Sequence, residues 1–184
     1  MRACHLFLEK GNVMKWTDLL QGEIEAAYGS TIGLIKLVEE DELGWKPPTG
    51  KNWMTTAQLL KHLTCACGAC MKGFVTGDWG MPEEMSEEEM LPPAEKLPAS
   101  DSVEQALAEL EADRVVALEM TERAGEEELE NRMVEAPWAP GLELPLGQHL
   151  HQMVGHLMQH KAQLFYYLKL MGKDVDTHTL YGME

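Results

Sequence analysis

Apolar residues recur at intervals of three and four along four long stretches of the chain, which is the period of an amphipathic helix. These stretches cover residues 16–38, 55–74, 100–125 and about 147–171. Thr55 and Gln58 have the spacing of a capping box, in which each side chain bonds a free backbone N–H of the other residue. No period-two alternation of useful length is present. The pattern therefore predicts an all-α four-helix bundle.

The segments between the predicted helices are rich in proline and glycine. Residues 41–52 form a connecting loop, and residues 126–146 form a second irregular stretch. Residues 75–99 contain four prolines, which exclude a long regular element, and a cluster of five glutamates at 83–89 that we interpret as a solvated face. A connection of this length can pass from one end of a bundle to the other, so we expect a long crossover between helices 2 and 3.

The length of the chain favours one folded domain. A chain of 184 residues buries roughly 70% of its unfolded surface, and it needs no metal merely to fold. We expect a loosely ordered leader over residues 1–13 and a bundle over 14–172. Residues 173–184 form a C-terminal tail that packs back on the bundle or frays.

The charge of the chain excludes several classes of partner. Its 15 Lys and Arg residues against 31 Asp and Glu residues give a net charge of −16. Such a chain repels nucleic-acid phosphates and anionic membrane surfaces. No apolar run is long enough for a spanning helix, and we expect a cytoplasmic protein. The absence of a glycine-rich phosphate loop and of a G-x-S-x-G turn disfavours nucleotide binding and α/β-hydrolase chemistry.

One face of the fourth predicted helix is polar where a core face is expected. Its members, at intervals of seven, three and four, are His149, Met153, His156, His160, Gln163 and Tyr167. Apolar residues flank this stripe, which indicates that it faces inward. Because each nitrogen of a buried neutral imidazole needs a partner, several such rings together require something that satisfies them jointly.

A divalent metal ion would satisfy these histidines. The i, i+4 spacing of His156 and His160 lets both rings converge on one ion, and His62 on the second helix is the candidate third ligand. The alternative is a set of hydrogen-bonded core histidines. We expect His149 and His151 to be exposed or hydrogen-bonded residues without a metal, and His5 and His178 lie in the tails and receive no role.

Three of the four cysteines lie close to His62 along the chain, at Cys65, Cys67 and Cys70. One hypothesis makes them soft metal ligands or redox thiols together with His62. On a continuous helix, however, Cys65 and Cys67 point about 200° apart and cannot share an ion. We therefore favour a packing role, because cysteine often behaves as a small buried hydrophobe.

Two segments of the chain resemble a known family. They are W-M-T-T-A-Q-L-L-K-H-L at 53–63 and H-L-M-Q-H-K-A-Q-L-F-Y-Y-L-K-L-M-G at 156–172. The chain is similar in these segments, and over about residues 14–172, to the DinB/YfiT-type family of metal-dependent four-helix proteins. Lys161 and Ala162 stand where the family usually has Arg and Gly, which leaves the ligand positions intact.

The resemblance implies a bundle with a long crossover and a three-histidine metal site at His62, His156 and His160. Characterised members of the family include transferases and isomerases that use bacillithiol, mycothiol or glutathione, and members often form homodimers. Many members have no known reaction. The family name refers to DNA damage, but the charge of −16 argues against contact with DNA here.

We therefore expect a metal-dependent enzyme of the thiol S-transferase or hydrolase type, acting on a small-molecule substrate. Three imidazoles leave open positions on an ion, which is typical of catalytic sites. Gln163 and Tyr167 are candidates for orienting a ligand or the substrate. Zinc and nickel are the favoured metals, with iron, manganese and copper as alternatives; imidazole suits zinc, nickel, copper and iron alike. The alternative is a non-catalytic small-molecule-binding or interaction protein with a structural or vestigial metal site.

Overall fold

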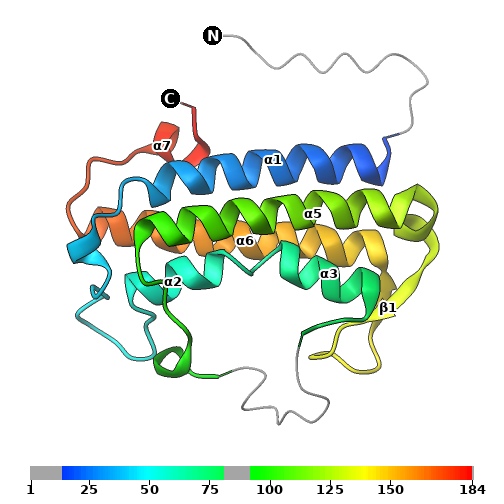
Figure 1. Ribbon diagram of the computed structural model, residues 1–184, viewed down its shortest axis with the longest axis horizontal. Helices are drawn as coiled ribbons and strands as arrows, with labels where there is room; N and C mark the ends of the chain where they lie inside the picture. The colour runs from blue at the N-terminus through cyan, green and yellow to red at the C-terminus, as the bar shows by residue number, and fades with distance from the viewer. Residues whose placement is uncertain (1–13, 81–91, 184) are drawn as a thin grey trace.

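The computed structural model describes residues 14–80 and 92–183 of the chain (Figure 1). Its long helices are α1 (Trp16–Ile35), α5 (Val103–Asn131) and α6 (Leu146–Leu170), together with the shorter α2 (Thr56–Leu63) and α3 (Gly68–Thr76). The smaller elements are α7 (Thr177–Tyr181), the 3-10 helices η1 (Glu40–Glu42) and η2 (Ala94–Lys96), and the strands β1 (Met133–Glu135) and β2 (Glu143–Pro145). The described chain is thus all-α, as the sequence predicts, apart from one small hairpin.

The long helices lie side by side as a bundle in which α2 and α3 together form one column (Figure 1). Helices α1 and α6 run in one direction, and α2, α3 and α5 run in the other. Because α3 and α5 share a direction, the chain crosses from one end of the bundle to the other between them, as predicted. The acidic residues of this crossover at 83–89 and the leader 1–13 lie outside the described residues.

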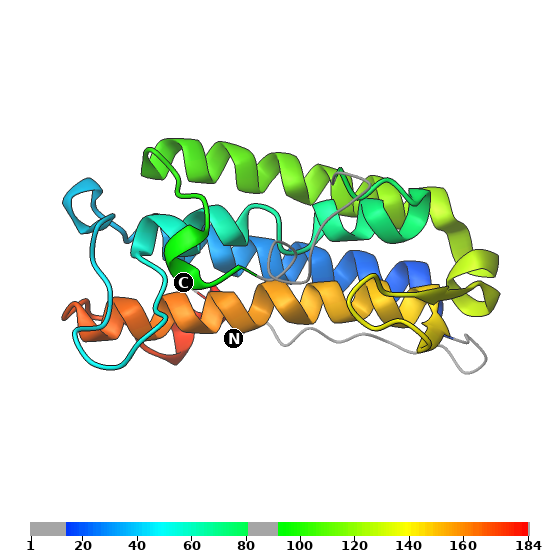
Figure 2. The same ribbon diagram turned by 90° about the horizontal axis from the view of Figure 1, so that it is seen from below.

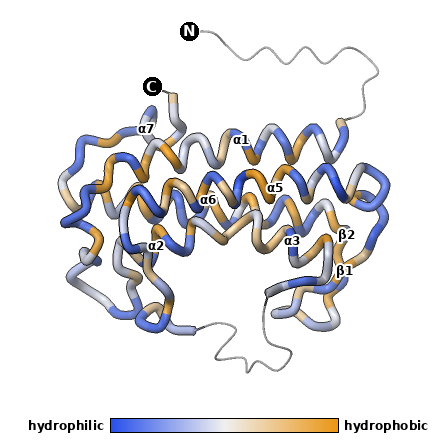
Figure 3. The backbone as a smooth tube through the Cα atoms, in the orientation of Figure 1, coloured by the Kyte–Doolittle hydropathy of each residue, from blue (hydrophilic) through white to orange (hydrophobic). Residues whose placement is uncertain are grey.

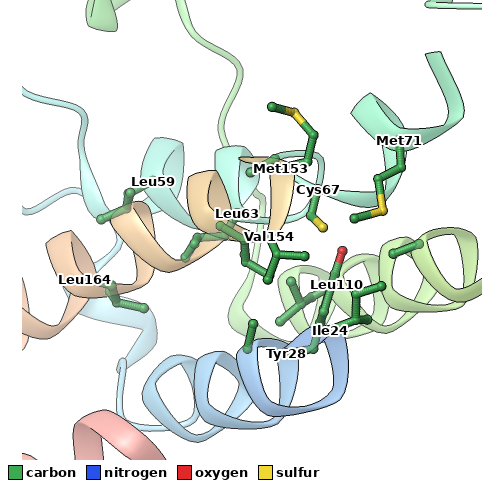
Figure 4. Packing of buried hydrophobic residues seen from close by; sticks show 14 of the residues in the cluster. Ile24, Tyr28, Leu59, Leu63, Cys67, Met71, Leu110, Met153, Val154 and Leu164 are labelled. Carbon is green, nitrogen blue, oxygen red and sulfur yellow. The ribbon is translucent and has the colours of Figure 1, made fainter. Parts of the chain in front are cut away.

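The apolar faces of the columns meet in one core. Helix α1 contacts α5 and α6, and so does α3, so that α1 and α3 lie diagonally opposite each other (Figure 2). Apolar and polar positions alternate along each long helix (Figure 3). The buried side chains that meet at the centre include Ile24, Tyr28, Leu59, Leu63, Cys67, Met71, Leu110, Val154 and Leu164 (Figure 4).

The second predicted helix is broken, which corrects the expectation of one continuous element over residues 55–74. Helix α2 begins at the expected capping box of Thr55 and Gln58 and ends at Leu63. The chain then turns, and α3 begins at Gly68. The buried carboxylate of Asp113 on α5 accepts hydrogen bonds from the backbone N–H groups of Gly68 and Ala69, at 2.9 and 2.7 Å. A distant side chain thus caps the first turn of α3.

The ends of two other helices also differ from the prediction. Helix α1 stops at Ile35 instead of Val38. At Gly125 the third predicted helix does not end but kinks, because this glycine adopts a φ of 67° that other residues rarely adopt, and helical turns continue to Asn131. The following stretch, predicted to be irregular, contains the antiparallel pair β1–β2, in which Val134 faces Leu144.

The C-terminal residues return to the bundle. Lys161 of α6 is buried, and its ammonium group donates hydrogen bonds to the hydroxyl of Ser30 and to the carbonyl of Leu180, at 3.1 and 2.9 Å. The segment around α7 therefore packs against α1 and α6. No helix in the described ranges is both long enough and apolar enough to span a bilayer.

Candidate metal centre

The three histidines predicted to bind metal lie together where α2 packs on α6. His62 is in the last turn of α2, and His156 and His160 are one turn apart on α6. The Nε2 atom of His156 is 3.2 Å from Nε2 of His62 and 3.1 Å from Nε2 of His160. All three rings are half-buried. Within residues 14–80 and 92–183 they form the one group of three or more metal-binding side chains with converging ligand atoms.

The break between α2 and α3 orients His156. The carbonyl of Ala66 lies in the turn between the two helices, 3.0 Å from Nδ1 of His156. Because a carbonyl oxygen only accepts, Nδ1 of His156 carries the proton and Nε2 is left with a free lone pair. The turn that sequence periodicity missed therefore fixes the tautomer of this histidine.

A relay of hydrogen bonds orients His160 in the same way. The hydroxyl of Tyr167 donates to the carbonyl of Met54 at 3.0 Å, so its oxygen is free to accept from Nε2 of Gln163 at 3.1 Å. The amide oxygen of Gln163 then faces Nδ1 of His160 at 3.1 Å and accepts a hydrogen bond from it, so the proton of this ring is on Nδ1. The Nε2 atom of His160 is consequently also a lone-pair acceptor.

Two acceptor atoms thus face each other across 3.1 Å, the distance between Nε2 of His156 and Nε2 of His160. A proton on Nε2 of His62 can satisfy only one of them fully. A cation between the rings satisfies all three. In a tetrahedral site with metal–nitrogen bonds of about 2.0–2.1 Å, neighbouring ligand atoms are about 3.3 Å apart. The distances from Nε2 of His156 to the other two rings, 3.2 and 3.1 Å, are close to this value. The side chains therefore fit a divalent ion.

Burial and mutual proximity keep these rings uncharged. Burial, followed by the neighbouring His160 and His156, lowers the pKa of His62 to about 4. Burial also lowers the pKa values of His156 and His160. Neutral imidazole is the form that binds metal, so the three rings are ready for an ion near pH 7 without first losing protons.

A pocket of about 680 Å³ opens beside the centre and brings together residues from α2, α3, α6 and two loops. His62 and His156 form one side of it. The other described residues that line it are Cys65, Ala66, Ala69, Cys70, Trp79, Trp138, Gln152, Met153 and Gln159. A three-histidine ion would therefore face open space in which a small molecule can lie.

The remaining predicted residues lie elsewhere. The Nε2 atom of His149 donates to the carbonyl of Val134 at 2.8 Å, so this buried ring is a hydrogen-bonded histidine, and the exposed His151 pairs with Glu23 at 3.1 Å. His178 lies beside Asp176 at the start of α7, whereas His5 is outside the described residues. Gln163 bonds Nδ1 of His160 and is itself bonded to Tyr167, and neither residue lines the pocket.

The cysteines have two different environments. Cys67 is fully buried, and its side chain points toward Tyr28 in the core (Figure 4). Cys65 and Cys70 instead line the pocket, and they do so because the chain is not helical between residues 63 and 68. Cys65 therefore does not lie on a continuous helix and does not pack in the core as predicted, although none of the three thiols joins the histidine cluster.

Sequence periodicity did not predict the role of Asp113 or the contributions of the turns and loops to the site. Asp113 occupies a core position of the third helix, between Leu110 and Ala117, and the rule that singled out the histidine stripe would have singled it out too. The carbonyl of Ala66 and the rings of Trp79 and Trp138 come from turns and loops, where no period indicates which way the residues face.

Comparisons with known proteins agree with this architecture. The family model of the DinB superfamily matches residues 23–164, a range that includes all three clustered histidines. The crystal structure of YjoA, a DinB-like protein from Bacillus subtilis, superposes with a TM-score of 0.63 at 16% identity, covering 87% of this chain and 96% of that chain. At this identity the likeness shows the fold alone. No curated protein sequence gives a significant match. Because the family model spans well over half of the chain, the chain belongs to the DinB superfamily.

Proposed function

We propose that this protein is a metal-dependent enzyme in which His62, His156 and His160 hold a divalent ion, and that it is of the thiol S-transferase or hydrolase type. The observation that carries the proposal is the pair of lone-pair acceptors 3.1 Å apart. They face each other because the Nδ1–H groups of the two rings donate to the carbonyl of Ala66 and to the amide oxygen of Gln163. Such an arrangement is unfavourable in an empty site and favourable around a cation.

The chemistry follows from the open side of the centre. A divalent ion held by three imidazoles would lower the pKa of a coordinated water to about 7 and would favour the deprotonated form of a coordinated thiol. The residues of this chain hold the ion, fix the tautomers of two ligands and shape the pocket for a small molecule. Zinc and nickel are the metals that we favour. Imidazole suits both of them, and it also suits iron and copper.

Metal analysis of the purified, untagged protein tests the proposal. We expect about one divalent ion per chain in the wild type, and a small fraction of that in the His156→Ala and His160→Ala variants, whose helical spectra should stay intact. His151→Ala is the matched control, because His151 lies on the same helix but outside the cluster. Equal metal content in the wild type and in His156→Ala would refute the metal centre.

A non-catalytic role is the second candidate. The described residues that line the pocket include no carboxylate or lysine that can act as a general base. A binding protein needs no such group. Turnover of an electrophile together with a small thiol, abolished by a chelator and by His160→Ala, would identify an enzyme. Stoichiometric binding without turnover would favour the binding protein.

A further inference from the structure

Aromatic rings wall one side of the pocket next to the histidines. Trp79 and Trp138 meet edge to face, with ring centroids 5.6 Å apart. Both rings also pack edge to face on Phe74, at 4.8 and 5.7 Å. Phe74 is in turn stacked on the buried ring of His149 at 4.3 Å. The wall is therefore held in place by the core, independently of any ligand.

Two local features fix the indoles in this wall. The ring of Trp79 lies directly on Gly73 of α3, where an added Cβ would be 2.3 Å from its Cε3 atom, so only glycine allows this approach. Arg132 donates to the carbonyls of Val75 and Phe74, at 3.0 and 3.4 Å, and so ties the base of the β1–β2 hairpin to α3. The hairpin loop carries Trp138, which is still 43% exposed. A large apolar surface is thus positioned at the pocket but left uncovered.

The pocket is also free of charge over its described lining. A quarter of the residues in the chain are charged, yet none of the described residues that line the pocket is Asp, Glu, Lys or Arg. Burial raises the pKa of Cys70 to about 12, so this thiol stays protonated at neutral pH. The polar groups near the opening are the amides of Gln152 and Gln159. Carboxylates and phosphates therefore find no lysine or arginine side chain in the described lining, and the net charge of −16 opposes their approach.

We propose that the pocket takes an uncharged substrate with a flat apolar group, which lies against Trp79 and Trp138 while a donor atom at its other end reaches the three histidines. The contact between the donor atom and the histidines rests on the proposed function. The contact of the apolar group with the two indole rings rests on the pocket alone. The volume of about 680 Å³ is that of a small-molecule site. An uncharged aromatic compound should therefore bind better than an anionic one of the same shape.

Two naphthalene dyes test the apolar end in metal-free protein. Prodan is uncharged, and 1-anilinonaphthalene-8-sulfonate is anionic. By fluorescence titration we expect prodan to bind about tenfold more tightly than the sulfonate, and Trp138→Ala to weaken prodan binding about tenfold. Tyr166→Ala, which removes an exposed ring of α6 outside the pocket, should change neither affinity. Equal affinities for the two dyes, or no loss in Trp138→Ala, would overturn the proposal.

A second variant keeps the dye test decisive if Trp138→Ala does not fold. Gln159 is exposed at the opening of the pocket, so Gln159→Lys should fold as the wild type does. The added ammonium group should raise the affinity for the sulfonate dye severalfold and leave prodan binding nearly unchanged. An unchanged preference between the dyes would show that they bind elsewhere and would refute the assignment.

Two hydroxamates separate this proposal from the proposed metal centre. Benzohydroxamate and acetohydroxamate share one metal-binding group, but only the first carries a ring. In zinc-loaded protein we expect benzohydroxamate to bind about tenfold more tightly, and this advantage to disappear in Trp138→Ala. Equal binding of both compounds would refute the aromatic wall but keep the metal centre. Binding of neither compound, with prodan still bound, would refute the metal centre but keep the wall.

Discussion

Two backbone carbonyl groups decide which nitrogen of His156 and of His160 faces the centre of the histidine cluster. The carbonyl of Ala66 accepts a hydrogen bond from Nδ1 of His156 directly, and the carbonyl of Met54 acts on His160 through Tyr167 and Gln163. Neither carbonyl can donate, so the direction of every hydrogen bond in these chains is determined. At the scale of single residues, the centre is therefore arranged for a cation before one binds.

The Gln163 side chain provides a test of this arrangement. Replacing it in Gln163→Leu leaves Nδ1 of His160 without its acceptor, and we expect the affinity for zinc to fall about 10- to 100-fold. Gln163→Glu keeps an acceptor at the same place and should retain most of the affinity. Competition with a chromophoric chelator measures both values. Gln148→Leu, on the exposed first turn of α6, is the control. Wild-type affinity in Gln163→Leu would contradict the relay.

At the scale of elements, Asp113 determines where α2 ends and α3 begins. Its carboxylate is buried and accepts from the hydroxyl of Tyr28 at 2.6 Å as well as from Gly68 and Ala69. Burial raises the pKa of Asp113 despite these hydrogen bonds. The carboxylate holds the turn that carries the Ala66 carbonyl, and through it the orientation of His156.

Substitution of Asp113 should therefore affect both stability and metal binding. Asp113→Asn replaces one acceptor oxygen by a donor group, which leaves at least one buried N–H or O–H unpaired and should lower the free energy of unfolding by about 1–3 kcal/mol. Tyr28→Phe removes a donor but leaves the carboxylate two partners, so we expect a smaller loss of about 1 kcal/mol. Urea denaturation measures both. Glu119→Gln on the exposed face of α5 is the matched control, and a loss no larger in Asp113→Asn than in this control would contradict the capping role.

The same elements show what the sequence could predict. The 3.6-residue period located α1, α5 and α6, and the i, i+4 spacing of His156 and His160 indicated their shared site, because these features depend on residues close together in the chain. The break before α3 depends on Asp113, which is 45 positions away from Gly68. The strands β1 and β2 have three residues each, too few for a visible alternation. Trp79 and Trp138 lie outside the helices, so no period could predict that they face the same pocket.

At the scale of the whole molecule, charged and uncharged surfaces are separated. The net charge of −16 is carried largely by exposed carboxylates, whereas the described lining of the pocket and the histidine cluster is uncharged. The bundle keeps the three imidazoles half-buried, and this burial lowers their pKa values. Folding is therefore coupled to the protonation of the cluster.

The metal-free protein should lose stability as the pH falls below about 6.5. The ordinary pKa of histidine, 6.5, applies to the unfolded chain, and the folded value for His62 is about 4. Between these values the unfolded state binds more protons, so the free energy of unfolding rises with pH. The contribution of His62 is fully present above pH 6.5 and is lost as the pH falls toward 4. We expect a loss of about 1–2 kcal/mol from His62 over this window, after allowing for the solvent contact of the ring.

Urea midpoints at pH 7.5, 6.0 and 5.0 measure this effect, because most carboxyl groups stay ionised over that range. His62→Gln should flatten the dependence, whereas His151→Gln, which changes an exposed histidine of α6 outside the cluster, should not. Saturating zinc should raise the midpoint at pH 7.5 and lose its effect as the pH falls, because protons and the ion compete for the same nitrogen atoms. If His62→Gln and the wild type show the same slope, the cluster does not supply the coupling between folding and pH, and the neutral state of its imidazoles would need another cause.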